Sequence, residues 1–398
     1  MFYAVVVITL SALSHSVSAA GCRVYLNGNL TQNHPPLFLH RTGNQFELLQ
    51  PTGSYFEWKR GETTVVGCST TKNVLTETGT GVAQLTCIDG QQFRTASSSG
   101  SVDFGAFSCR STVSGVIRAQ EKPCADGIGS WYDAGFEVNG VPFVKYFQVC
   151  YNLATSTPIY SEHQLLGASL SHAQINNVRP SFKLGVLTPT VRLTSVYTQR
   201  EQLERFTTLL GSSKEASKYI DSGSFLAKGH LTPDADAILN NWAAATYFFL
   251  NAAPEWQIVN GGNWKRVENA VRKVATQLND TLQVYTGVYD VLRLPDIEGS
   301  SVPITLGGDG SVAVPKWLWK VAVHQPTNAA IAFITLNNPF ATNEERLCED
   351  ICARHGWHQK EFLELRKGLT YCCAVSDAQN AIKHIPKSIR SKAVLKLQ

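Results

Sequence analysis

The pattern of hydrophobic and polar positions changes character near residue 150. Before that point, from about residue 21, apolar residues fall into short runs that glycine, serine and threonine interrupt. No stretch of a dozen residues there keeps a helical period, and short alternating runs are typical of strands buried on one face. We therefore predict a mostly antiparallel, β-rich domain over 21–150, with strands near 46–49, 63–66, 82–85, 115–118 and 143–147.

After residue 150 the chain mixes helical and strand-like patterns. Apolar spacing predicts a helix over 197–210, and Thr232-Pro233 has the residue types of an N-cap and first position of a second helix. A third helix is expected from about 260–263 to 278, with its apolar positions on one buried face. The mixture predicts an α+β catalytic domain over 151–398. The expected strands lie at 226–230, 282–285, 312–314, 319–323 and 331–334.

The N-terminus and the cysteines both indicate a secreted protein. Residues 2–13 form an apolar run, and Val17-Ser18-Ala19 has the form of a cleavage site, so 1–20 is expected to be a signal peptide. No later segment reaches the roughly 18 apolar residues that a membrane-spanning helix needs. The ten cysteines suit up to five disulfides in an oxidising, extracellular environment.

The cysteines form two groups along the chain. Six lie between 22 and 150 and should pair among themselves; four lie between 348 and 373. We expect Cys348 and Cys352 to pair with Cys372 and Cys373, and the connectivity within each group stays open. The spacing of Cys348, Cys352, His355 and His358 superficially resembles a zinc motif, but disulfides are the favoured interpretation in a secreted chain.

The formal net charge of +4 is concentrated at the C-terminus. Five of the last sixteen residues are Lys or Arg and none is acidic, so the rest of the chain is close to neutral. Attraction to nucleic acid would therefore have to come from a local patch or from this tail.

Two segments carry candidate chemistry. His230 follows Gly229 at the end of a short apolar strand, and Asn260, Trp264 and Glu268 follow at steps of four on the third helix. At 100° per residue those three side chains share a sector of about 80°. A base, a neutral metal ligand and basic neighbours are what metal-assisted phosphodiester cleavage requires. The plainer alternatives are a structural histidine and a helix-capping asparagine.

Asp234 and Asp236 form a second acidic candidate. They could bind a metal as a pair, but in the first turn of a helix that begins at Thr232 they would more simply complement its dipole.

Taken together, the two segments resemble the DNA/RNA non-specific endonuclease family. Its hallmark is Asp-Arg-Gly-His, followed by Asn-x-Gly-x-Trp-x-x-Leu-Glu, and the resemblance covers about 151–375. The Ala227-Lys228-Gly229-His230 variant, the Arg179-Pro180-Ser181-Phe182 segment and the cysteine-rich N-terminal half are most similar to crustacean secreted members, including duplex-specific nucleases.

The resemblance implies a fold and a set of roles. The fold is the ββα-metal (His-Me finger) nuclease domain, an antiparallel sheet flanked by helices. His230 matches the general base, Asn260 the protein ligand of a Mg²⁺ ion that Mn²⁺ can replace, and Glu268 the carboxylate that orients metal-bound water. The phosphate-contacting cations are Arg272, Lys228 and Arg179.

The resemblance also carries departures and alternatives. Ala227 and Lys228 stand where most members have aspartate and arginine, and lysine keeps the charge but loses the bidentate fork. We expect a secreted Mg²⁺-dependent endonuclease that leaves 5′-phosphate ends and prefers double-stranded DNA. The alternatives are a nuclease that acts on DNA and RNA alike and a non-catalytic nucleic-acid-binding protein. Oligomeric state, biological purpose and the role of the N-terminal domain stay open.

Overall fold

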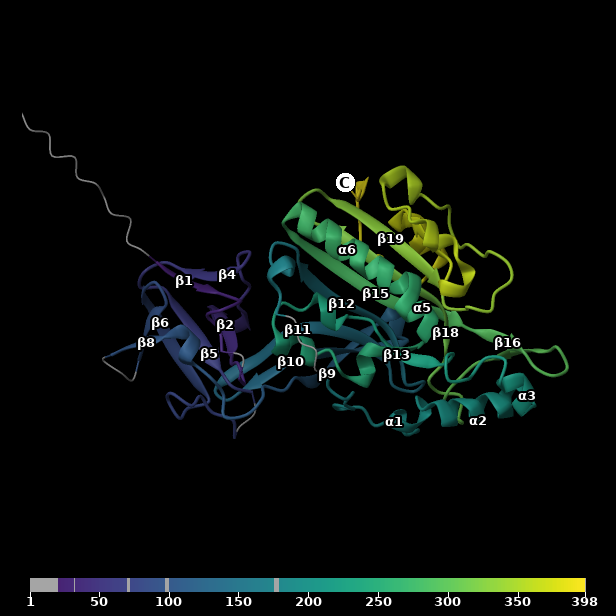
Figure 1. Ribbon diagram of the computed structural model, residues 1–398, viewed down its shortest axis with the longest axis horizontal. Helices are drawn as coiled ribbons and strands as arrows, with labels where there is room; N and C mark the ends of the chain where they lie inside the picture. Colours follow the sequence, from purple (N-terminus) through teal and green to yellow (C-terminus); the bar gives the residue numbers. More distant parts are fainter. Residues whose placement is uncertain (1–20, 32, 70–71, 97–99, 175–178, 398) are drawn as a thin grey trace, which may run out of the picture.

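A computed structural model describes residues 21–31, 33–69, 72–96, 100–174 and 179–397. The predicted signal peptide lies outside the described residues. Figure 1 shows the N-terminal strands at one end of the molecule, next to β9–β11 of a large sheet whose face carries the longest helix, α6.

The N-terminal region consists of two small antiparallel sheets around one apolar core. Aromatic side chains fill this core, among them Phe38, Trp58, Phe93 and Phe104, and the disulfides Cys22–Cys87 and Cys68–Cys109 tie it together. The strands predicted near 46–49, 63–66 and 82–85 are confirmed here, whereas those predicted near 115–118 and 143–147 form but belong to the large sheet. One sheet pairs β1 (Cys22–Tyr25) with β4 (Tyr55–Trp58), and the other has the order β3 (Gln45–Leu48), β2 (Leu37–Thr42), β5 (Thr63–Gly67), β6 (Val82–Asp89), β7 (Gln92–Thr95), β8 (Ser101–Asp103).

Within the described residues the largest sheet has nine strands, and all of its pairings are antiparallel except the short parallel contact of β21 with β19. The predicted domain boundary after residue 150 falls inside β11, in the middle of this sheet. The order is β20 (Thr370–Cys373), β19 (Ala329–Leu336), β18 (Pro315–His324), β15 (Thr281–Val291), β12 (Thr157–Leu166), β11 (Val141–Asn152), β10 (Gly129–Val138), β9 (Val116–Cys124), with β21 (Ala393–Val394) on β19.

Both faces of this sheet are covered, which explains why β18 and β19 are apolar almost throughout. One face packs against α6 (Lys265–Leu278), whose Val267, Val271 and Val274 are buried as predicted. The other face packs against α7 (Val375–Ala381) and the C-terminal segment. The expected pairing of the C-terminal cysteines is confirmed, as Cys348–Cys373 and Cys352–Cys372, and Cys124–Cys150 closes the first group.

The remaining elements are short. The helix predicted over 197–210 is confirmed as α2 (Gln199–Leu210), which Thr198 caps. The other helices are α1 (Leu193–Val196), α3 (Ser213–Ala216), α4 (Asn240–Ala244), α5 (Gln257–Val259), the π-helical η6 (Asn260–Trp264) and the 3₁₀ turns η1 (Phe104–Ala106), η2 (Ala125–Gly127), η3 (Leu170–His172), η4 (Asp234–Asp236), η5 (Phe249–Asn251), η7 (Ala353–His355), η8 (Lys360–Leu363) and η9 (Leu365–Lys367). Two further pairs are β13 (Leu226–His230) with β14 (Ala252–Trp256), and β16 (Arg293–Pro295) with β17 (Ser301–Pro303).

Two predicted elements are wrong. No helix begins at Thr232, because its backbone N–H donates to the side chain of Asn251 (2.9 Å) and its hydroxyl to Ser161 (3.0 Å); only η4 follows it. No strand forms over 312–314, because Val312 has a positive φ of 55° that breaks the extended conformation.

None of the helices in the described ranges is long and apolar enough to cross a membrane.

Candidate active site

One cavity of about 650 Å³ gathers the residues singled out from the sequence. It opens between β13, the loop that follows it, and the helical run that begins at Gln257. Two antiparallel strands followed by a helix form the framework, since β14 leads directly into α5. All six predicted site residues line the cavity: Arg179, Lys228, His230, Asn260, Glu268 and Arg272.

The pairing of β13 with β14 explains why a glycine precedes the histidine. Gly229 lies opposite Ala253, and a Cβ atom placed on Gly229 would lie 2.0 Å from the carboxyl carbon of Glu255. The buried Glu255 side chain occupies that space. Lys228 and His230, which flank Gly229 in an extended strand, project to the opposite side and line the cavity.

His230 lies in an aromatic environment that favours its neutral form. Its ring centre is 4.9 Å from that of Phe182 and 4.8 Å from that of Tyr247. Burial lowers the pKa of His230 to about 4; the charge of Asp234 opposes this shift and that of Arg179 adds to it. Among the described residues, nothing hydrogen-bonds its buried Nε2 atom. A neutral imidazole that lines a cavity can accept a proton from a substrate or water.

The two aspartates that follow the histidine point to different partners. Asp234 lines the cavity and accepts a hydrogen bond from the Tyr247 hydroxyl (2.5 Å). Asp236 is buried and contacts His163 and Arg272. The dipole interpretation is therefore wrong, because no helix begins at Thr232, and the two carboxylates do not act as a metal-binding pair.

The zinc-like spacing near the C-terminus is also accounted for. In the part of the chain that the structure describes, the one cluster with metal-ligand character is Asp350, Cys352 and Cys372. Because Cys352 and Cys372 are joined to each other, their sulfur atoms are not free to bind zinc.

The helical run from α5 through η6 to α6 presents the second half of the site. Asn260 lies one turn inside this run, since its first turn begins at Gln257, so the interpretation of Asn260 as an N-cap is wrong. Its side-chain amide makes no hydrogen bond to any residue of the described ranges and lines the cavity. Glu268 lies two turns further on, and burial raises its pKa to about 7 although Lys320 and Arg272 oppose the shift.

Four cations line the cavity, namely Arg179, Lys228, Arg272 and the exposed Lys265 at the start of α6. The Arg272 guanidinium donates from Nη1 to Asp236 (2.6 Å) and from Nη2 to Asn269 (2.7 Å). Lys228 Nζ lies 5.6 Å from the ring centre of Phe182 and 5.4 Å from that of Tyr197, and burial lowers its pKa. Arg179 is exposed at the rim. Positive charge from three separate elements thus converges on one opening.

The sequence analysis missed a layer of buried charged residues beneath the site. Lys320 of β18 is almost fully buried, donates from Nζ to Thr286 Oγ1 (2.5 Å) and lies over the ring of Trp264. Burial raises the pKa of Glu255 well above its usual value, and nothing in the described ranges hydrogen-bonds its Oε2 atom. The available signal was the lysine in the apolar run 317–323, where a lone charge indicates a buried partner.

The donor set fits a hard divalent cation. The amide of Asn260 and the carboxylates of Glu268 and Asp234 offer oxygen atoms to one cavity, and no thiolate lies in it. Oxygen ligands with room for water are what Mg²⁺ prefers.

Comparisons with known proteins agree with this geometry. Residues 129–378, more than half of the chain, match the family described as DNA/RNA non-specific endonuclease. The chain is similar to a "Salivary endonuclease" of Lutzomyia longipalpis, with 29% identity over 95% of this chain and 87% of the relative. It is also similar to "Salivary protein Tsal2A" of Glossina morsitans morsitans, with 28% identity over 94% of each chain.

Among solved structures, the chain is similar to one titled "Crystal structure of the EndoG/EndoGI complex: Mechanism of EndoG inhibition". The identity is 15%, the TM-score is 0.39, and the match covers 63% of this chain and 87% of that one.

Proposed function

Because the chain belongs to the DNA/RNA non-specific endonuclease family, a family of phosphodiester hydrolases, we propose that it is a secreted, Mg²⁺-dependent endonuclease of ββα-metal architecture. The substrate is DNA, with double strands preferred, and the products carry 5′-phosphates. One observation carries the proposal: a histidine that burial keeps neutral shares a cavity with Asn260, Glu268 and four cations. The five disulfides and the salivary names of relatives support secretion.

His230 is the general base of the proposed reaction. As the oxygen of a water molecule attacks phosphorus, one of its protons moves to the imidazole of His230. The bond between phosphorus and the 3′ oxygen breaks, the phosphate stays on the 5′ side, and the 3′ oxygen takes a proton from solvent. The low pKa of His230 keeps the imidazole unprotonated at neutral pH, so the base is ready before substrate binds.

Asn260 would hold the Mg²⁺ ion, or Mn²⁺ in its place, and Glu268 would orient the water around it. When bound, the ion supplies stabilisation of the negative charge that develops on the phosphate oxygens. Arg272, Lys228 and Arg179 contact phosphates. Lys228 does so as a point charge, since an ammonium group has no bidentate fork.

Two observations bear on the substrate. The preference for double strands rests on the motif resemblance alone, and the expected likeness to crustacean members is not matched by the relatives found, which are salivary proteins. The family description, which names both DNA and RNA, supports a second candidate, a nuclease that cleaves both nucleic acids. The relatives reported above come from insects, and their names do not specify a strand preference.

The test is a cleavage assay on plasmid, linear duplex, single-stranded DNA and RNA, each with Mg²⁺ and with excess chelator. We expect cleavage of duplex DNA that needs Mg²⁺, ends that a ligase can rejoin, and no cleavage by His230→Ala. His172→Ala is the matched control, since His172 lies outside the cavity. Equal rates on RNA and duplex DNA would favour the second candidate, and binding without cleavage by the wild-type protein would support a non-catalytic binding protein.

A further inference from the structure

The carboxylate of Asp236 connects three elements around the proposed active site. Its Oδ2 atom lies 2.9 Å from Nε2 of His163 on β12, and its Oδ1 atom accepts a hydrogen bond of 2.6 Å from Nη1 of Arg272 on α6. Asp236 itself ends η4, six residues after His230. One side chain therefore connects the loop that follows His230 to α6, the helix that carries Glu268 and Arg272.

The three partners are buried, so the contacts are not surface ion pairs. The side chains of His163, Asp236 and Arg272 are 0%, 5% and 17% exposed. Burial alone would raise the pKa of Asp236, yet the hydrogen bond from His163 and the charge of Arg272 hold it well below its usual range. An ionised carboxylate only accepts, so the His163 Nε2 atom must donate. Removing one partner would leave a buried charge without compensation.

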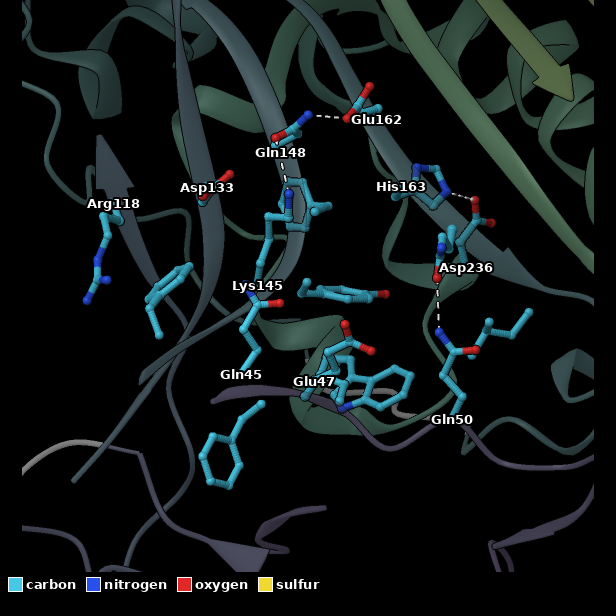
Figure 2. A pocket seen from close by; sticks show the side chains of 18 of the residues that line it. Gln45, Glu47, Gln50, Arg118, Asp133, Lys145, Gln148, Glu162, His163 and Asp236 are labelled. Atoms are coloured by element: carbon cyan, nitrogen blue, oxygen red, sulfur yellow. Dashed lines mark hydrogen bonds and ion pairs between the residues drawn. The ribbon is translucent and has the colours of Figure 1, made fainter. Parts of the chain in front are cut away.

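The pair also forms a wall between two cavities. His163 and Asp236 line a groove of about 740 Å³ between the N-terminal region and the large sheet, where Figure 2 shows them facing each other. Arg272 lies on the other side and lines the proposed active site. Asp236 is not among the residues that line the proposed active site, so its carboxylate holds the guanidinium without taking part in that lining.

We propose that Asp236 and His163 are positioning residues that hold Arg272 in the geometry for contacting the scissile phosphate. This inference rests on the proposed function. A free arginine side chain has many rotamers, and the hydrogen bonds from Nη1 to Asp236 and from Nη2 to Asn269 restrict that freedom. His163 fixes Asp236 in turn. Misplacing a group by about 1 Å costs on the order of 100-fold in rate, so such a support affects catalysis without contacting DNA.

The first test is a double-mutant cycle on kcat/KM for duplex DNA, with Asp236→Ala, Arg272→Ala and the double variant. We expect each single change to lower kcat/KM by about 10- to 100-fold. If Asp236 acts through Arg272, the double variant should be no slower than Arg272→Ala alone. Multiplied losses in the double variant would overturn the proposal. Asp236→Asn, which keeps the shape, serves in the same cycle if the alanine variant does not fold.

The second test separates positioning from general support of the fold. His163→Gln keeps a donor near the position of Nε2 and should retain most activity, whereas His163→Leu should lose it. The matched control is the His324–Asp280 pair at the far end of β18, with an Nε2–Oδ2 distance of 3.1 Å. His324→Leu should leave kcat/KM per folded molecule unchanged.

Equal activity of His163→Gln and His163→Leu, or an equal loss in His324→Leu, would overturn the proposal. If the wild-type protein cleaves nothing, the proposed function fails first. A cleaving wild type with insensitive Asp236 and His163 variants means that only the positioning role fails.

Discussion

Glu268 shows how a single residue of the site is held in an unfavourable state. Its side chain is 15% exposed, and burial raises its pKa to about 7 even with Lys320 and Arg272 nearby. Burying a charged carboxylate lowers the free energy of unfolding, and its ion-pair partners offset only part of that loss. Such a cost is common where a protein keeps a charge ready for a ligand.

The residue-scale prediction concerns Glu268→Gln in metal-free buffer. Because the folded pKa of Glu268 lies above the unfolded value, its carboxyl group contributes stability that is present below about pH 4.5 and lost as pH rises through about 7. Glutamine has no charge to bury. Relative to wild type, the variant should therefore gain on the order of 1 to 3 kcal/mol of unfolding free energy between pH 5.5 and pH 8.

Urea unfolding at the two pH values measures this gain, and a cleavage assay should show that the more stable variant is less active. Glu204→Gln, at an exposed position of α2, is the control and should change stability equally at both pH values. A Glu268→Gln difference that does not depend on pH would contradict the prediction.

At the scale of elements, local pattern was enough for some segments and not for others. α2 and α6 were predicted because their apolar residues repeat with a helical period, and β13 because five residues between turn-forming segments suit a strand. The helix predicted to begin at Thr232 was wrong, because the local sequence Thr232-Pro233 suits a helix start. The contact that decides its conformation, with Asn251 nineteen residues away, is not visible in a local pattern. The same limit hid Lys320 and Glu255, whose partners come from other elements.

The segment that carries Asn260 depends on the C-terminal part of the chain. The fully buried Asn263 donates from Nδ2 to the backbone carbonyls of Glu361 (2.6 Å) and Gly368 (2.7 Å). These bonds fix η6 against the segment 360–368, and a Cβ on Gly262 would lie 3.0 Å from the carbonyl oxygen of Lys367. The start of the catalytic helix is therefore positioned by residues about one hundred positions later.

The element-scale prediction is that Asn263→Ala destabilises the protein by about 2 kcal/mol or more, because two buried carbonyl groups lose their donors. Cleavage activity should fall as well, since Asn260 lies one turn before Asn263. Thermal unfolding and the cleavage assay measure the two effects. Asn380→Ala, at an exposed position of α7, should change neither, and an equal effect of both substitutions would refute this account of η6.

At the scale of the whole molecule, the grouping of the cysteines predicted which segments are joined by disulfides. It did not predict how the N-terminal region packs against the loop next to the proposed active site. That relation arises from long-range packing: Ile238, Leu239 and Trp242, just after the proposed catalytic loop, belong to the same apolar core as Leu37 and Phe38. No periodicity in either segment indicates the other.

Polar contacts strengthen this junction. Asn241 donates from Nδ2 to the carbonyl of Pro36 (3.1 Å), and Ser169 donates to the carbonyl of Pro51 (3.1 Å). The N-terminal region therefore covers the segment 237–245. This segment directly follows Asp236, which lies six residues after His230 of the cavity. None of the described residues of 21–111 lines the proposed active site, yet this region supports the loop that follows His230.

The last prediction follows from this arrangement. A chain that begins at residue 112 should be poorly soluble and inactive, because Ile238, Leu239 and Trp242 would lose their cover and expose an apolar patch. Solubility, circular dichroism and cleavage of duplex DNA measure the outcome, with the full mature chain as the control. Supplying residues 21–111 as a separate chain during refolding should recover part of the activity, since the junction is noncovalent apart from the chain itself. A soluble truncated chain with wild-type kcat/KM would show instead that the nuclease part folds independently and that the N-terminal region serves another purpose.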